Sequence, residues 1–530
     1  MDSMVDAVKA ANLHEILGVF MIGCILYWVL FYGDRLHSGI PTAGVDPTAW
    51  FKAASARTAF MLDGKGVIQK GLEDYPSVFQ VVTGTGTKIV LPNRFVEDIK
   101  NNPQLSLVDA IHKEFFASYY AFRPYAASKT AFVMTEVVRT KLSNSLGITV
   151  LMAGRRIFAD GVSEMIGDLA DETNCALEDI FGSSTEWQTR NLKAEVLHLI
   201  ARLSSRVFLG QDMARSEQWL DISKSYTIDS FIAIRMMRQW PAALRSLVYW
   251  LSPKCKRVRE QVSTSGQLIW PLVEGHRQRK RKALEAGLPA PDGQDTISWM
   301  DELADGVDCD VPCGQLILSV VALHTTTELL TQALFDLCHH PELTQPLREE
   351  VISVVGDKPL TKAVLFKLRL MDSFLKESQR LHIGDITTMQ RFAHAKVVLS
   401  DGSTIPRGAK VVTTMEMMMD PTIYPNPEIF DAYRFLKMRE SAGQENRWQF
   451  VSTCSEHMGF GNGQHACPGR FFAANETKVA LCHLLLKYDW KFPDNAQKDG
   501  TDVTFGTEFE SSLEAKVLLR RRKEEITFKL

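Results

Sequence analysis

The stretch FGNGQHACPGR, Phe460–Arg470, combines three glycines, one proline, one histidine and one cysteine in a chain of 530 residues. Its glycine spacing matches a dinucleotide-binding loop, but no strand pattern precedes it and no crossover unit with a suitable acidic residue follows. A zinc site would need close partners for Cys467, and the candidates lack the spacing of a tetrahedral site: Cys454, His465 and Cys482. The stretch therefore presents one thiol.

This thiol, of Cys467, lies on a glycine-rich loop that runs into a predicted helix, Phe471–Leu486. Backbone N–H groups at a helix N-terminus stabilise a thiolate. Gly463 and Gly469 leave room for a flat ligand, and a cationic His465 is placed to meet an acidic group at the rim of that ligand. Haem has this shape and charge, and a thiolate on its iron favours cleavage of the O–O bond.

The spacing of six residues here resembles the haem-binding signature of the cytochrome P450 family: Phe460, Gly463, His465, Cys467, Gly469 and Ala473. Histidine stands where the family more often has arginine. The resemblance implies a haem b cofactor with Cys467 as the axial ligand of its iron, surrounded by the other signature residues. The alternative, a merely buried cysteine on a loop, does not account for the further motifs of the chain.

A second motif is Glu377-x-x-Arg380, in the stretch LKESQRLH. Residues three apart on a helix face each other, and a surface ion pair of this kind adds little stability. Further along, Phe430–Phe435 reads FDAYRF and resembles the meander motif of the family, whose arginine is here Arg434. The resemblance implies that Glu377, Arg380 and Arg434 form a structural triad required for folding and haem retention.

The stretch Ala322–Thr327 reads ALHTTT within a predicted long helix. Consecutive threonines are unfavourable there, because β-branching restricts their rotamers and their hydroxyls compete for backbone carbonyls. The resemblance places an oxygen-binding groove here and maps its catalytic threonine to Thr326. Where the family usually has glycine and an acid, this chain has Leu323 and Thr325. Proton delivery is then expected from Thr325, His324 or ordered water, or the chemistry departs from simple hydroxylation; a packed helix with back-bonded threonines is the alternative.

Two further arginines bear on the haem carboxylates. Arg391, in the stretch MQRFA, resembles the family residue that binds a propionate, as His465 does from the cysteine loop. The family's early-helix arginine, which normally follows a tryptophan, has no clear counterpart, and Arg139 is the position chosen for it. By analogy the substrate pocket is expected from four segments: Phe115–Arg123, Val321–Thr325, Ile383–Thr388 and Phe505–Phe509.

The whole composition is that of a globular protein, with 45% hydrophobic and 23% charged residues, enough for one large domain or a few smaller ones. A formal net charge of −3 gives no electrostatic case for binding nucleic acid. Nine cysteines without a repeating spacing argue against a disulfide scaffold and favour reduced thiols in a cytosol-facing domain.

Helical periodicity dominates the chain, so the predicted fold class is mainly α with a minor β-sheet region, as in the cytochrome P450 fold. The longest amphipathic stretches are Leu192–Phe208, Trp219–Trp240 and Gln315–Leu337. Strand-like segments are few. Ala395–Leu399, an Asp-Gly corner at Ser400–Ser403, and Lys410–Thr414 predict a hairpin.

The N-terminus carries an uncharged apolar run, Ile16–Tyr32, of seventeen residues, near the lower limit of roughly 17 to 25 that span a bilayer. No small-residue cleavage site of a signal peptide follows, and Lys and Arg are more frequent after the run than before it. We therefore predict a single-pass anchor in residues 1–38, with a helix at about 16–32, and a catalytic domain in residues 39–530 on the cytosolic side of the endoplasmic reticulum membrane. A buried N-terminal helix is the alternative.

The expected function follows from the resemblance, and the expected source of electrons follows from the cofactor motifs that the sequence lacks. No flavin or nicotinamide fingerprint is present, so electrons are expected from a separate NADPH-dependent flavoprotein reductase, with cytochrome b5 as an additional partner. Stretches such as ARLSSRVFLG and ACPGRFFAANE resemble fungal members that tailor terpenoids and other secondary metabolites, including ent-kaurene-oxidase-like enzymes. The expected reaction uses dioxygen to hydroxylate or multiply oxidise an apolar terpenoid or indole diterpenoid. Ring expansion, desaturation or rearrangement of a polyketide or hybrid metabolite is the alternative, and a non-catalytic haem sensor is a third hypothesis.

Overall fold

The computed structural model describes residues 17–18, 20–23, 36–45, 52–126, 129–142, 161–289, 293, 295–304, 309–494 and 502–528. Most of the predicted anchor helix at 16–32 lies outside the described residues. The predicted division at residue 38 therefore stays a prediction.

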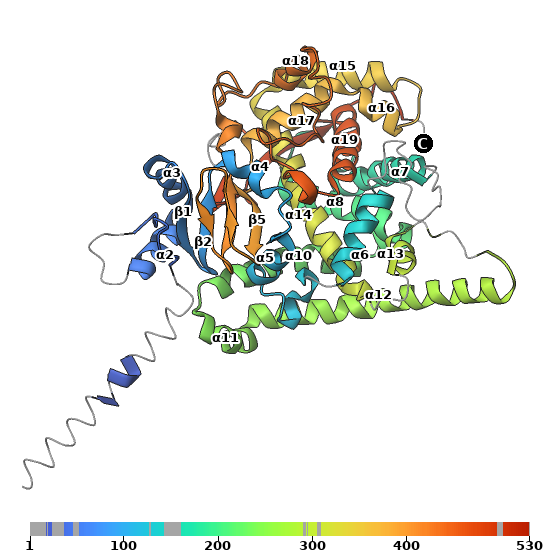
Figure 1. The fold of residues 1–530 in the computed structure, drawn as a ribbon. Helices are drawn as coiled ribbons and strands as arrows, with labels where there is room; N and C mark the ends of the chain where they lie inside the picture. The colour runs from blue at the N-terminus through green and yellow to red at the C-terminus, as the bar shows by residue number, and fades with distance from the viewer. Residues whose placement is uncertain are drawn as a thin grey trace, which may run out of the picture.

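Helices make up most of the structure, as predicted (Figure 1). The α-helices are α2 (Lys52–Leu62), α3 (Gly64–Asp74), α4 (Val96–Ile99), α5 (Leu107–Glu114), α6 (Lys129–Val137), α7 (Gly161–Phe181), α8 (Leu192–Leu209), α9 (Gln211–Ala214), α10 (Glu217–Arg238), α11 (Arg245–Leu251), α12 (Pro253–Glu285), α13 (Thr296–Ala304), α14 (Val311–His339), α15 (Thr344–Val355), α16 (Lys362–Lys367), α17 (Arg369–Leu381), α18 (Arg434–Glu440) and α19 (Arg470–Lys487). The long helices predicted from periodicity correspond to α8, α10, α14 and α19, and their ends differ from the predictions by a few residues.

The strands are β1 (Phe79–Thr83), β2 (Gly86–Leu91), β3 (Leu105–Ser106), β4 (Gln188–Asn191), β5 (Thr387–Ala393), β6 (Val397–Val398), β7 (Thr404–Ile405), β8 (Lys410–Thr414), β9 (Tyr488–Lys491), β10 (Asp502–Phe505), β11 (Glu508–Ser511) and β12 (Lys516–Arg521). The largest sheet has the order β1-β2-β8-β5-β3, with β2 and β8 parallel. It lies at one side of the molecule beside α2 and α3, and the helices fill the other side (Figure 1).

The predicted hairpin is correct at its corner but wrong in its second strand. β6 pairs with β7 in antiparallel register around Gly402, which has a φ of 85° that suits glycine. Lys410–Thr414 is a strand, β8, but it pairs with β5 and β2. Strand partners depend on contacts between distant segments, which the local turn signal does not contain.

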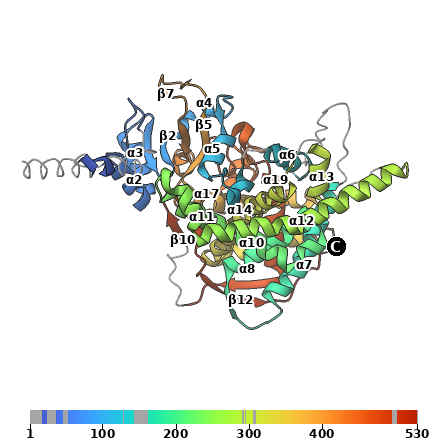
Figure 2. The same ribbon diagram turned by 90° about the horizontal axis from the view of Figure 1, so that it is seen from below.

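Helix α14 is the axis of the helical part and packs against α8, α10, α12, α17 and α19. It begins where the Asp310 side chain accepts a hydrogen bond from the backbone N–H of Cys313 at 3.2 Å, next to Pro312 in the first turn. Seen from below, α12 crosses the face formed by α10 and α14 (Figure 2). Within the described residues, α14 is the one helix long and apolar enough to cross a membrane, but 67% of its most apolar window is buried inside the protein, as expected for a core helix.

Candidate active site

The loop before α19 folds back on itself and presents Cys467. The backbone N–H of Cys467 donates to the carbonyl of Phe460 at 2.8 Å, which closes the loop. Gly461 and Gly463 have φ values of 69° and 75°, in the left-handed region that favours glycine. A Cβ on Gly463 would lie 2.7 Å from the Cβ of Lys100, so any side chain at this position would clash with its neighbour.

The surroundings of the Cys467 sulfur suit a metal-bound thiolate. Burial raises the pKa of the Cys467 thiol, whereas the backbone N–H groups of Gly469 and Arg470 and the Arg470 guanidinium oppose that rise. These donors belong to the start of α19, where the helix dipole also favours negative charge. A bound cation is the remaining requirement, because a ligating thiol must be deprotonated and its charge neutralised.

One buried basic side chain near the Cys467 loop, Arg391, has no carboxylate partner among the described residues. Arg391 on β5 is only 2% exposed, its Nη1 donates to the backbone carbonyl of Gln390 at 2.8 Å, and its Nε has no partner among the described residues. Burial therefore lowers the pKa of Arg391 to about 10. Burial first, then the charges of Arg391 and Arg139, also lower the pKa of His465. An acidic ligand would compensate this uncompensated charge.

The structure thus brings the Cys467 loop, which also carries His465, together with Arg391 and Arg139 from two other places in the chain. Arg139, in the short helix Val138–Leu142, also forms an exposed pair with Glu136 at 2.9 Å. A thiol with backbone donors and a cluster of cations fit haem b, which has an iron for the sulfur and two carboxylates for the cations. The residues present therefore fit this cofactor.

Two cavities meet at His324 and Thr325 on α14, and both residues line both cavities. The first, of ≈580 Å³, includes Phe115, Arg123 and Val321 in its wall. The second, of ≈680 Å³, is lined by every residue from 383 to 388 and by Phe509. Parts of all four segments predicted for the substrate pocket thus line these cavities; the side chain of Phe505 lies outside the described residues.

The two candidate threonines lie on different faces of α14. The Thr325 hydroxyl donates to the carbonyl of Val321 at 2.7 Å, and Val321, 51% exposed, lines the first cavity. Thr326 is only 2% exposed and lies near the buried carboxyl of Glu476 on α19. The structure therefore does not bring Thr326, the threonine predicted from the resemblance, to the cavities, because about 100° of helix rotation per residue turns it into the core.

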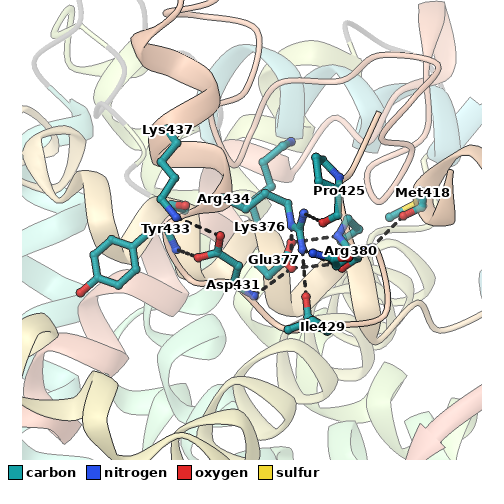
Figure 3. A network of polar contacts seen from close by, with 12 residues as sticks. Lys376, Glu377, Arg380, Met418, Pro425, Ile429, Asp431, Tyr433, Arg434 and Lys437 are labelled. Carbon is teal, nitrogen blue, oxygen red and sulfur yellow. Dashed lines mark hydrogen bonds and ion pairs between the residues drawn. The ribbon is translucent and has the colours of Figure 1, made fainter. Parts of the chain in front are cut away.

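The predicted triad is buried, which excludes the alternative of a surface ion pair (Figure 3). Arg380 donates to both carboxylate oxygens of Glu377 at 2.8 Å, and both side chains are 0% exposed. Arg434 donates to the same carboxylate at 2.9 Å. The excess positive charge is offset by backbone carbonyls, since Arg434 also donates to those of Pro425, Asn426 and Ile429 at 2.7, 3.2 and 2.9 Å.

Sequence reasoning missed Glu476, although it is the sole acidic residue in α19. It is fully buried, and Ser204 donates to its Oε1 at 2.7 Å. Burial raises the pKa of Glu476 to about 8, and the nearby Ser204 and Thr326 hydroxyls only moderate this rise. A lone acid in an apolar helix beside the cysteine loop was the signal that could have found it.

We expect Arg434→Lys to lower the free energy of unfolding by about 3 kcal/mol or more and to reduce the haem retained per chain, because the backbone carbonyls around Arg434 lose their donors. Thermal unfolding and haem content measure these effects. Lys437→Ala is the control, since Lys437 is 68% exposed and pairs with Asp431 at 3.2 Å on the surface. Equal losses in both variants would contradict a special role for the triad.

Glu476→Gln tests the buried acid. The folded protein keeps Glu476 protonated up to about pH 8, whereas in the unfolded chain the group ionises near its ordinary value of 4.5. Folding stability should therefore fall as pH rises through this window, and the variant should lose that dependence. We expect the difference in Tm between variant and wild type to grow from about pH 5 to about pH 8. Glu349→Gln, at an exposed carboxylate, is the matched control. A difference between Glu476→Gln and wild type that stays constant with pH would refute the assignment.

Comparisons with known proteins agree with this geometry. A family model described as cytochrome P450 matches residues 155–509. Cytochrome P450 monooxygenase adrA of Penicillium rubens is 39% identical, over 96% of this chain and 97% of that protein. Cytochrome P450 monooxygenase hepE of Aspergillus oryzae is 37% identical over 90% of this chain and 85% of that protein, and calE of Penicillium decumbens is 35% identical over 99% of both. The chain therefore belongs to the cytochrome P450 family.

Proposed function

We propose that this protein is a membrane-anchored haem-thiolate monooxygenase that hydroxylates, or oxidises repeatedly, an apolar secondary metabolite of the terpenoid or indole diterpenoid type. The observation that carries the proposal is the environment of Cys467: backbone N–H donors at the start of α19 act on its sulfur, and its loop lies beside the buried Arg391, which has no carboxylate partner among the described residues. The family binds haem b, and its related members are named as monooxygenases.

When bound, thiolate-ligated haem supplies the activation of dioxygen. Cys467 would ligate its iron, and Arg391 and His465 would hold its carboxylates, with Arg139 as a third candidate. Thr325 holds a hydroxyl proton at the place where the two cavities meet, in a hydrogen bond to the Val321 carbonyl. We therefore assign proton delivery to Thr325, assisted by His324, rather than to Thr326.

An apolar substrate is supported by the wall of the first cavity. Phe115 stacks on Tyr125 with ring centroids 4.7 Å apart, and Phe231 meets Phe115 edge-on at 6.1 Å. Phe231 also contacts the His324 ring at 4.8 Å. Rigid aromatic surfaces of this kind suit a fused-ring hydrocarbon, because they bury its surface without a large loss of side-chain entropy.

Electron supply and location belong to the same proposal. The chain carries no flavin or nicotinamide motif, so a separate NADPH-dependent flavoprotein reductase would provide electrons, with cytochrome b5 as an additional donor. The apolar run Ile16–Tyr32 would anchor the protein in the endoplasmic reticulum membrane, with the catalytic domain in the cytosol. The fungal sources of the related proteins support a role in fungal metabolism.

A second candidate function uses the same haem for ring expansion, desaturation or rearrangement. It is favoured by one feature, the absence of any acidic residue between Val321 and Thr327 on α14, which removes the usual carboxylate from proton delivery. Turnover of the purified protein with reductase, NADPH and isotopically labelled dioxygen separates the two. Oxygen insertion leaves labelled oxygen in the product, whereas desaturation or rearrangement does not.

Cys467→Ser tests the thiolate. We expect the reduced wild-type protein to show the red-shifted Soret band of thiolate ligation with carbon monoxide, and the variant to lose it because a serine oxygen is a much weaker ligand. The control is Cys454→Ser, at a half-buried cysteine of the preceding segment, which should retain the band. If both variants keep the band, the assignment of Cys467 as the ligand is overturned.

Thr325→Val and Thr326→Val form a matched pair at neighbouring positions. Valine keeps the shape and removes the hydroxyl, so Thr325→Val should lower the product formed per NADPH by about tenfold or more and release more hydrogen peroxide. Thr326→Val should change thermal stability while leaving that ratio near the wild-type value. If Thr326→Val lowers the product formed per NADPH and Thr325→Val does not, Thr326 is the catalytic threonine and the assignment to Thr325 is wrong.

A further inference from the structure

The carboxyl of Asp385 faces the interior of the substrate region. Asp385 follows α17, and it lines both the ≈680 Å³ cavity that reaches Thr325 and a neighbouring cavity of ≈190 Å³. Its Oδ1 accepts hydrogen bonds from the backbone N–H and the hydroxyl of Thr387, at 2.8 and 2.9 Å. The chain is fixed here, because Ile386 N–H donates to Thr507 O and Phe509 N–H to Gly384 O, at 3.1 and 2.8 Å.

Asp385 forms no ion pair with any residue in the described part of the chain. Its side-chain donors are the neutral Thr387 and Thr507, and the adjacent Glu508 adds negative charge. The nearby cations are already engaged, since Arg235 and Arg238 bind Glu508 at 2.8 and 3.3 Å. Burial, and to a smaller extent Glu508, raise the pKa of Asp385 to about 7. An unneutralised acid in such a place is costly to folding, and groups of this kind cluster at functional sites.

The other charged side chains that line the larger cavity all have charged or hydrogen-bonding partners in the protein. Glu328 accepts from the backbone N–H and the hydroxyl of Ser511 at 2.8 and 2.7 Å, and His382 bonds to Asp336 at 2.8 Å. Glu416 accepts from the N–H of Asn93 at 2.7 Å. Arg380 belongs to the buried triad, and Lys65 lies over the Phe509 ring at 5.2 Å. Of the acids in this wall, Glu328 pairs with Lys193 and Glu416 is exposed, so Asp385 is the partly buried acid without a cationic partner among the described residues.

The rest of this wall is largely apolar. Side chains from α3, α14, β11 and the segments around them contribute to it: Ile68, Leu72, Leu329, Ile383, Met419 and Phe509. An apolar molecule that fills this space would displace water from Asp385 and leave the carboxyl with only its Thr387 and Thr507 hydrogen bonds, unless the molecule itself supplied another.

We propose that Asp385 is a specificity-determining residue that hydrogen-bonds a hydroxyl group of the substrate, so that the enzyme acts on an apolar skeleton that already carries oxygen. A hydroxyl fits because it both donates and accepts, and therefore pairs with a carboxyl or a carboxylate. This inference rests on the proposed function. The reaction that supplies the substrate must then be an earlier oxygenation, or a cyclisation that ends with the capture of water.

The test uses N-alkylimidazoles, whose ring nitrogen ligates ferric haem and whose tail extends into the space beyond it. Pairs of equal chain length end in either a methyl or a hydroxymethyl group, and dissociation constants come from titration of the Soret band. For each protein, the preference is the dissociation constant of the methyl compound divided by that of the hydroxyl compound. At the chain length that reaches Asp385, this ratio should be about tenfold larger for the wild-type protein than for Asp385→Leu. Asp385→Asn, which still forms hydrogen bonds, should keep most of the preference.

Unsubstituted imidazole is the internal control and should bind all forms equally. If the wild-type protein shows no chain length with a preference for the hydroxyl compound, or if Asp385→Leu keeps the same preference, the inference is overturned while the proposed function stands. If imidazole itself produces no spectral shift and the carbon monoxide complex lacks its band, the proposed function fails first. Should Asp385→Leu not fold, Asp385→Ala and the wild-type measurement decide the question.

Discussion

The buried carboxylate of Glu377 holds the structure around the active site together. It accepts from two guanidiniums, one on its own helix and one more than fifty residues along the chain, at Arg434. Without it, two cations would lie unpaired in the interior, which costs several kcal/mol. The helix that carries Glu377 leads directly into the cavity wall at Ile383–Thr388, and the segment that carries Arg434 leads on to the Cys467 loop. One ion network thus positions both sides of the site.

The charges of the site make sense only in combination with a bound group. Burial raises the pKa of the Cys467 thiol and lowers the pKa of the Arg391 guanidinium. Burial therefore disfavours the charged form of each group, the thiolate of Cys467 and the guanidinium of Arg391. A ligand with a cationic metal at its centre and carboxylates at its edge would relieve both costs at once. The same interior pairs Glu377 with two guanidiniums and gives Asp385 only neutral hydrogen-bond partners among the described residues.

Helix α14 separates two environments with very different chemistry. One face, with Val321 and Thr325, opens to the cavities, and Thr326, about 100° further around the helix, packs toward the buried Glu476 on α19. The two neighbouring threonines therefore place their hydroxyls in different environments, Thr325 at the cavities and Thr326 at a core carboxyl. The run of threonines, unfavourable as it is for a helix, provides hydroxyls to both sides.

Local patterns in the sequence were sufficient to predict the mainly helical fold and the cysteine loop before α19, because each depends on spacing along a few residues. The Glu377, Arg380 and Arg434 triad was predicted from the resemblance of two compact motifs to those of the family. Local patterns did not predict which strands pair with β8, on which face of α14 Thr326 lies, or that Asp385 has no cationic partner among the described residues. Each of these depends on which distant segment is packed against a residue, and burial and charge compensation exist only once that packing has formed. The sequence by itself determined which groups are available for chemistry, and only the tertiary structure decided which of them are neutralised and which remain to meet a ligand.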